Sequence, residues 1–199
     1  MAITTELIKE IRDITGVSVM QCKKALEEAG GDKEKALILL RKQSAATALK
    51  KGERELGAGT VASYVHAGGT VGAMVVLASE TDFVSKNEEF KKLAYDIAMQ
   101  VAATIPSYLR KEDITEADTI KAREVFAKEV EEAGAGKPQE IKEKMLQGKL
   151  DAYFNDKVLL EQPFIKNPEV TIAGLIDQAI QKFGERVAVV RFSRFSATE

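Results

Sequence analysis

Residues 60–77 read TVASYVHAGGTVGAMVVL, and this stretch decides the fold class. Apolar residues alternate with polar or small ones on both sides of Gly68 and Gly69, which is the period of a half-buried β-strand. Glycine tolerates the positive φ that tight hairpin turns require. The stretch therefore predicts an antiparallel hairpin with strands over residues 60–66 and 70–77.

Downstream of this hairpin, apolar residues recur with the 3.6-residue period of a helix. Ser85 and Glu88 have the spacing of a capping box, which predicts a helix that begins at Ser85. A helical hairpin is expected over about 118–154, because a short Gly-containing break separates two helical patterns and Pro138 is placed to open the second.

The C-terminal part of the sequence adds one more strand. A loop through Pro163 and Pro168 leads to a helix expected at 171–183, and residues 186–195 again alternate with period two. Residues 59–199 are therefore expected to form an α+β core and dimerisation domain. Its small antiparallel three-stranded sheet is packed with helices and carries the helical hairpin. An open edge on so small a sheet is a place where a second copy of the chain can bind.

Upstream of the hairpin, residues 1–50 predict a bundle of three short helices. Thr4 or Thr5 can cap the first helix, Ser18 the second and Asp32 the third. A unit this small buries little apolar surface and is typical of a docking module.

Small and basic residues predominate over residues 41–54, which predicts a helical extension that fades into an exposed linker. The linker is assigned to residues 51–58. The charge there is either that of a solvated linker or that of an RNA contact.

Composition and charge exclude several classes of protein. The 29 basic and 31 acidic residues give a formal charge of −2, which argues against direct nucleic-acid binding through a basic surface. One cysteine, Cys22, cannot form an internal disulfide, and with a single histidine it cannot make an ordinary zinc site. Cys22 is expected to be a small buried apolar residue. No metal is expected.

Neither a targeting segment nor a membrane span is expected. Charged residues interrupt the first ten residues, unlike a signal peptide, and the uncharged run 56–79 contains five glycines and alternates as strands do. The sequence therefore predicts a cytoplasmic protein.

Motifs for covalent chemistry are not recognisable. Residues 134–138 lack the spacing of a phosphate-binding loop, and the only histidine, His66, stands at the end of a hairpin strand. Paired carboxylates remain open, but nothing in the sequence singles out any pair. We expect no catalytic residue, no cofactor and no small-molecule substrate, so the chain is not expected to be an enzyme.

One segment departs from ordinary turn chemistry. Thr81, Asp82, Phe83 and Val84 follow the second strand of the hairpin, where a turn is normally polar. Phe83 either fills the core as a hydrophobic staple or stands at the tip of a loop as an anchor for a partner protein. The sequence alone leaves both interpretations open.

Three motifs in the same order resemble the bacterial translation elongation factor Ts family. Residues 81–86, TDFVSK, are similar to the central motif of that family, and residues 12–26, RDITGVSVMQCKKAL, resemble its ubiquitin-associated-like docking domain. Residues 136–149, GKPQEIKEKMLQGK, followed by QPF at 162–164, supply the third match. Together the motifs span nearly the whole chain.

The resemblance implies a guanine nucleotide exchange factor that acts on the GTPase elongation factor Tu. It implies an exchange motif that dislodges magnesium from elongation factor Tu and consists of Thr81, Asp82, Phe83 and Val84. It also implies the short form of the family, which is a homodimer. The alternative function is an adaptor without exchange activity that recruits a client through the three-helix module.

Partner-binding residues implied by the resemblance lie elsewhere in the chain. Several also have a plainer interpretation, since Val19 has the spacing of a core residue, and Lys51 and His66 are positions at which a side chain is often merely solvated. The implied residues are Val19, Met20, Lys23, Lys51 and His66.

Overall fold

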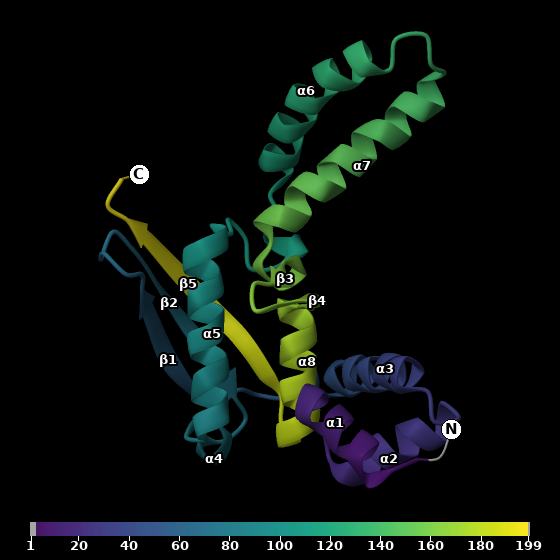
Figure 1. Ribbon diagram of the computed structural model, residues 1–199. Coiled ribbons are helices and arrows are strands. Elements are labelled where there is room, and N and C mark those ends of the chain that lie inside the picture. Colours follow the sequence, from purple (N-terminus) through teal and green to yellow (C-terminus); the bar gives the residue numbers. More distant parts are fainter. Residues whose placement is uncertain (1–2, 199) are drawn as a thin grey trace. The chain divides into compact units, whose positions relative to one another are not determined.

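The computed structural model describes residues 3–198. Its contacts divide the chain into two compact units, one of Met1–Ala102 with Ile172–Glu199 and one of Ala103–Thr171. The expected docking module and linker both fall within the first unit. The fold is α+β, as the sequence predicts, and its helices and strands are labelled in Figure 1.

Three helices form the N-terminal bundle: α1 (Thr5–Thr15), α2 (Val19–Glu28) and α3 (Lys33–Lys51). Each has an apolar face turned toward a common core, which is the usual source of stability for short helices. The fully buried core residues are Ile11, Val17, Cys22, Ala25, Leu26, Ala36 and Leu40.

Helix caps explain where these three helices begin. The Thr4 hydroxyl accepts from the Leu7 N–H at 3.2 Å, which settles the choice between Thr4 and Thr5. Ser18 and Gln21 form a full capping box, and Asp32 accepts from the N–H of the third residue after it. Each bond satisfies a backbone donor that the first turn of a helix leaves free.

Helix α3 continues through Lys51, so the helical extension expected after residue 41 is confirmed, and it does not fade before residue 51. Its second half packs along α8 (Ile172–Phe183). Ser44 is 3% exposed, donates to the Leu40 carbonyl at 2.9 Å and also bonds Gln181 of α8. The small residues that resemble a linker in the sequence are the ones that let two helices approach closely.

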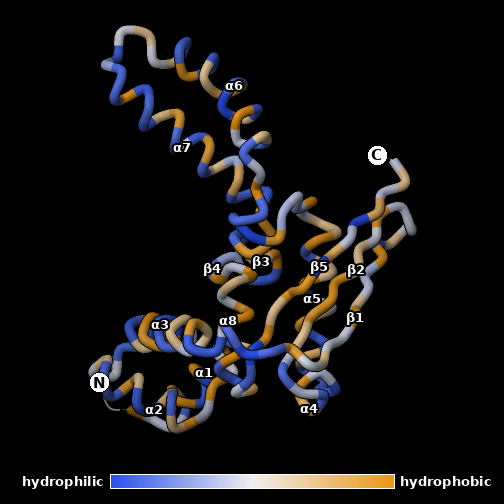
Figure 2. The backbone as a smooth tube through the Cα atoms, turned by 180° about the vertical axis from the view of Figure 1, so that it is seen from behind, coloured by the Kyte–Doolittle hydropathy of each residue, from blue (hydrophilic) through white to orange (hydrophobic). Residues whose placement is uncertain are grey.

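The main sheet consists of β1 (Ala58–Val65), β2 (Val71–Ser79) and β5 (Val187–Ser196) in the antiparallel order β1-β2-β5. The hairpin turn lies at Gly68 and Gly69, whose φ values of 99° and 72° confirm the turn predicted there. Figure 2 shows hydrophobic residues along much of β2 and β5, as expected for a sheet with one face in the core.

One face of the sheet is covered by α5 (Glu88–Thr104), as Figure 1 shows. The rings of Tyr64 on β1 and Tyr95 on α5 meet edge to face, with centroids 5.7 Å apart. Arg194 on β5 donates its Nε–H to the carbonyl of Ala102 at 3.2 Å. Side chains alternate along a strand, so the neighbours of Tyr64 point to the opposite face of the sheet.

The short helix α4 (Asp82–Ser85) precedes α5, and the expected capping box at Ser85 is wrong. Ser85 ends α4, and its hydroxyl donates to the Asp82 carbonyl at 3.3 Å. Asn87 caps α5 instead, because its Oδ1 accepts from the Glu89 N–H at 2.8 Å. Asn87, two positions later, is the cap of the helix, whereas the sequence spacing predicts Ser85.

The second unit contains the expected helical hairpin, formed by α6 (Glu116–Ala133) and α7 (Gln139–Lys157). Ion pairs join the two helices, with Lys142 2.6 Å from Glu131 and Lys149 2.7 Å from Glu129. The apolar residues buried between the helices are Ala122, Val130, Leu146, Leu150 and Phe154.

The rest of this unit consists of short helical turns and strands. The helical turns η1 (Lys111–Asp113) and η2 (Leu159–Glu161) flank the hairpin, and β3 (Pro163–Phe164) pairs with β4 (Asn167–Thr171). The sequence predicted only a loop through the two prolines there. Among the described residues 3–198, no helix is long and apolar enough to cross a membrane.

Candidate partner-binding site

The segment Thr81–Val84 joins β2 to α5 and contains most of α4. Phe83 is 86% exposed, whereas Val84 beside it is 8% exposed. The interpretation of Phe83 as a core residue is therefore excluded, and Val84 fills that role. A single helical turn between two buried segments places one aromatic ring in solvent.

Asp82 lies next to this ring and carries a charge. Lys86, one turn further along, places its Nζ 2.6 Å from Asp82 Oδ2. This hydrogen bond and the positive charge of Lys86 lower the pKa of the Asp82 carboxyl. The exposed surface of α4 therefore combines an aromatic ring with an ionised carboxylate.

The segment is held at its base by a turn between α8 and β5. Glu185 accepts two hydrogen bonds from Thr81, one from the N–H at 2.9 Å and one from the hydroxyl at 2.6 Å. Glu80 accepts from the backbone N–H of Arg186 at 2.5 Å and from the Arg54 guanidinium at 3.2 Å. These bonds, with that of Arg186 the stronger influence, lower the pKa of Glu80.

On the N-terminal bundle, the three expected docking residues share one side of α2. Val19 is 49% exposed and Met20 is 73% exposed, so Val19 is not a core residue. The Lys23 ammonium lies 3.8 Å from the carboxylate of Glu27, an exposed pair that contributes little to stability. Residues three and four apart lie on the same helix face, so Val19, Met20 and Lys23 form one continuous patch.

Lys51 and His66 lie at different ends of the first unit. Lys51 donates to the carbonyl of Gly184, one residue before the carboxylate that holds Thr81, so it lies near the segment Thr81–Val84. His66 stands at the hairpin turn, where its Nδ1 is 2.9 Å from the Tyr64 hydroxyl. The length of β2 separates His66 from Thr81 by roughly 25 Å, because a strand advances about 3.3 Å per residue.

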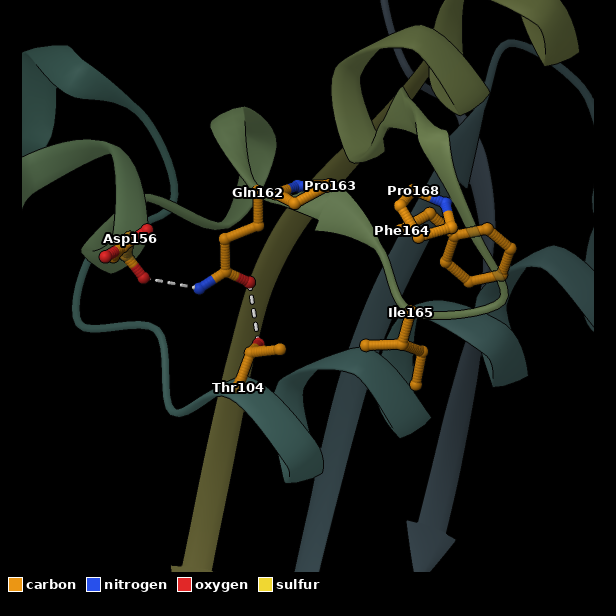
Figure 3. Close-up of a pocket in the computed structure, with 7 residues that line it drawn as sticks. All are labelled: Thr104, Asp156, Gln162, Pro163, Phe164, Ile165 and Pro168. Carbon is orange, nitrogen blue, oxygen red and sulfur yellow. Dashed lines mark hydrogen bonds between the residues drawn. The ribbon is translucent and has the colours of Figure 1, made fainter. Parts of the chain in front are cut away.

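A cavity of about 400 Å³ in the second unit involves the third sequence motif (Figure 3). Gln162, 3% exposed, accepts from the Thr104 hydroxyl at 2.6 Å and donates to the Asp156 carbonyl at 2.7 Å. Both ends of its amide are therefore engaged within the unit. Gln162 holds the chain together at this point, which is a structural role.

The single cysteine lies in the core of the N-terminal bundle. Cys22 is fully buried, as expected, and burial raises the pKa of its thiol. Within residues 3–198, no group of three or more His, Cys, Asp or Glu side chains could hold a metal ion. The exposed groups of the site are suited to binding another molecule.

Sequence reasoning missed the residues that position the site. Glu185 accepts two hydrogen bonds from Thr81, and Glu80 accepts from the backbone N–H of Arg186 in the same turn, yet neither glutamate belongs to a recognisable motif. The only local signal is Gly184, which marks the end of α8 and the turn in which Glu185 lies.

Comparison with known proteins gives the class and the family. The chain is 46% identical over 197 residues to elongation factor Ts of Carboxydothermus hydrogenoformans, covering 99% of this chain and 90% of that protein. It is 47% identical over 195 residues to elongation factor Ts of Thermodesulfovibrio yellowstonii, covering 98% of this chain and 96% of that protein. These relatives define the class as a translation elongation factor.

The family model "Elongation factor TS" matches residues 43–199. Elongation factor Ts of Herpetosiphon aurantiacus adds 43% identity over 195 residues, which cover 98% of both chains. The chain belongs to the elongation factor Ts family. The family named from the three sequence motifs is thereby confirmed.

Proposed function

We propose that this chain is a guanine nucleotide exchange factor, which binds elongation factor Tu with GDP and promotes release of the nucleotide during translation elongation. The observation that carries the proposal is Phe83, 86% exposed beside the ionised Asp82. Exposed aromatic side chains are frequent anchors in protein interfaces. Membership of the elongation factor Ts family supports the choice of partner.

The mechanism requires no covalent chemistry. An exchange factor binds the nucleotide-free GTPase more tightly than the nucleotide-bound one, and thermodynamic reciprocity then weakens nucleotide binding by the same factor. Magnesium bridges the nucleotide phosphates and is held by loops of the GTPase. Displacing those loops removes a large part of the nucleotide affinity. The chain is therefore not an enzyme in this proposal.

Within that mechanism, Thr81–Val84 is the exchange motif. Phe83 inserts between helices of the GTPase domain and moves the elements that support the magnesium site. Asp82 acts on charge near the same surface after it leaves Lys86, and an exposed ion pair of this kind costs little to break. Val84 anchors the motif in the core of this chain.

Docking precedes exchange. We assign it to the ubiquitin-associated-like bundle of residues 1–50, joined by the linker 51–58 to the core of residues 59–199. Val19, Met20 and Lys23 on α2 supply its contact patch. Lys51 and His66 contact other parts of elongation factor Tu, with His66 reaching a distal domain.

A homodimer is the second part of the proposal. The sheet face opposite α5 is apolar yet exposed, and Val65 and Phe195, both 66% exposed, are joined across the sheet through Gly72. Val61 and Met74 continue the same face. Two copies of this face bury each other's apolar surface, which is favourable because such surface is removed from water.

We place this activity in the cytoplasm, where translation occurs. The test is release of fluorescent GDP from elongation factor Tu into excess unlabelled GDP. We expect the chain to accelerate release and to bind nucleotide-free elongation factor Tu more tightly than the GDP form. Equal binding of the two forms without acceleration would identify an adaptor and overturn the proposal.

A further inference from the structure

Thr81 has all of its polar groups engaged. Its N–H and hydroxyl both donate to the Glu185 carboxylate, at 2.9 and 2.6 Å. Its carbonyl accepts from the Ser79 hydroxyl at 2.9 Å and from the Ser85 N–H at 3.3 Å. The Thr81 hydroxyl does not cap α4, although Thr81 stands at the capping position. The hydroxyl is engaged by the Glu185 carboxylate instead.

The helix that follows depends on such anchors. With four residues, α4 is far below the length at which a helix is stable by itself. On its far side, the Thr60 hydroxyl donates to the Ser85 carbonyl at 2.9 Å, and Val84 and Ser85 are buried. On its near side, Glu185 holds the chain just before Asp82. The direction of Phe83 is fixed from both ends.

The turn that carries Glu185 is itself held in place. Gly184 has a φ of 73°, and its carbonyl accepts from the Lys51 ammonium. Arg186 donates its backbone N–H to Glu80 at 2.5 Å and its guanidinium to the carbonyl of Arg54. Three consecutive residues thus connect the end of α3, the end of β2 and the exchange motif.

We propose that Glu185 is a positioning residue for exchange, which fixes Phe83 and Asp82 in the orientation that engages the partner by holding Thr81 at two points. This inference rests on the proposed exchange function. Charge-assisted hydrogen bonds are stronger and geometrically stricter than neutral ones. A functional side chain held by such a support is preorganised, and losing the support costs rate even though the side chain itself remains.

Three variants separate this role from a general effect on stability. Glu185→Ala removes both contacts with Thr81. Glu185→Gln keeps an acceptor for the Thr81 N–H and offers an amide donor to the Thr81 hydroxyl oxygen. Both contacts with Thr81 therefore persist without the negative charge. Glu89→Ala is the matched control, because it deletes a carboxylate that pairs with Lys182 at 2.6 Å in the same unit and does not contact the motif.

The first measurement is stimulated GDP release over a range of exchange-factor concentrations. We expect Glu185→Ala to lower the maximal release rate about tenfold while the half-saturating concentration changes less than about twofold. Glu185→Gln is expected to stay within about threefold of the unmodified chain, and Glu89→Ala to match it. If Glu185 only stabilised the fold, Glu185→Gln would not restore the rate, and the maximal rate and the half-saturating concentration would change together.

The second measurement does not require exchange activity. Hydrogen exchange at the Thr81 amide is expected to accelerate at least tenfold in Glu185→Ala, while the amides paired between β1 and β2 stay protected. Unchanged protection at Thr81, or an unchanged maximal rate alongside an active unmodified chain, overturns the positioning role. An unmodified chain that does not accelerate GDP release overturns the proposed nucleotide-exchange function instead. Hydrogen exchange at the Thr81 amide still tests whether Glu185 holds Thr81.

Discussion

Phe83 and Val84 are adjacent in the chain and lie in opposite environments, with exposed fractions of 86% and 8%. The single turn of α4 produces this contrast, because Val84 and Ser85 are buried while Phe83 points away from the unit. Val84 therefore packs in the core, and in the proposed function Phe83 is the side chain that contacts the partner. Changes at Phe83 and at Val84 should have different consequences.

Phe83→Ala is expected to reduce the maximal rate of stimulated GDP release at least tenfold and to leave folding intact. Substitutions at exposed positions usually change the free energy of unfolding by less than about 0.5 kcal/mol, so Tm should shift by no more than about 2 °C. Stopped-flow release of fluorescent GDP and thermal melting check the two parts.

Leu49→Ala is the control for this variant, since Leu49 is also apolar and 83% exposed but lies on α3. It should release GDP at the unmodified rate. A Phe83→Ala protein that melts far earlier than the control would show that the ring supports the fold, and an active one would remove Phe83 from the mechanism.

The fold could be predicted wherever local chemistry determines it. The alternation in residues 60–77 and the glycines at its centre specify a hairpin, and Ser18 and Asp32 mark helix starts, since capping is a local effect. The packing of the second half of α3 could not be predicted, because its partner is α8, more than a hundred residues away. The β3–β4 pair is too short to give a recognisable pattern.

The sequence singles out the candidate segment Thr81–Val84 but does not predict its geometry. The TDFV motif departs from normal turn composition, which directs attention to Phe83. Exposure depends on how α4 meets the core, and no local pattern contains that information. Glu185 could not be identified from the sequence either, because its contact with Thr81 joins residues 104 positions apart.

Met20→Ala is expected to weaken docking and to leave the maximal rate of nucleotide exchange unaffected. Met20 is 73% exposed on α2, so its loss removes contact area from the partner and little from the core of the bundle. The half-saturating concentration in the release assay should rise about fivefold while the maximal rate stays within about twofold.

Ile38→Ala provides the comparison, because Ile38 is 51% exposed on α3 and lies outside the proposed patch. Its half-saturating concentration should not change. A lower maximal rate for Met20→Ala at unchanged affinity would contradict a docking role.

Phe195→Asp is expected to convert a dimer into a monomer. Phe195 lies on the exposed sheet face, opposite Gly72 and in line with Val65, and an aspartate there would place two charges in a buried interface. Light scattering coupled to size exclusion measures the mass directly. Val125→Asp, at a residue 60% exposed on α6, should leave the mass unchanged. A monomeric unmodified chain would contradict the homodimer.

Asp177→Asn is expected to stabilise the protein at neutral pH. Asp177 lies on α8 one turn before Gln181, which bonds α3, and burial raises the pKa of its carboxyl above 3.8. The folded state therefore binds the proton more tightly than the unfolded state. The ionised carboxylate costs stability above the raised pKa, and this cost disappears as the pH falls through that pKa toward the unfolded value. Asparagine carries no charge and avoids the cost at every pH.

The check is a comparison of Tm for the variant and the unmodified chain between pH 4 and pH 8. The variant should melt at a higher temperature at pH 7, and the difference should shrink as the pH falls through the raised pKa of Asp177. Asp13→Asn, at an exposed position of α1, is the surface control and should leave Tm at pH 7 unchanged. A variant that melts lower at pH 7 would mean that the Asp177 carboxylate accepts a stabilising bond that outweighs its desolvation.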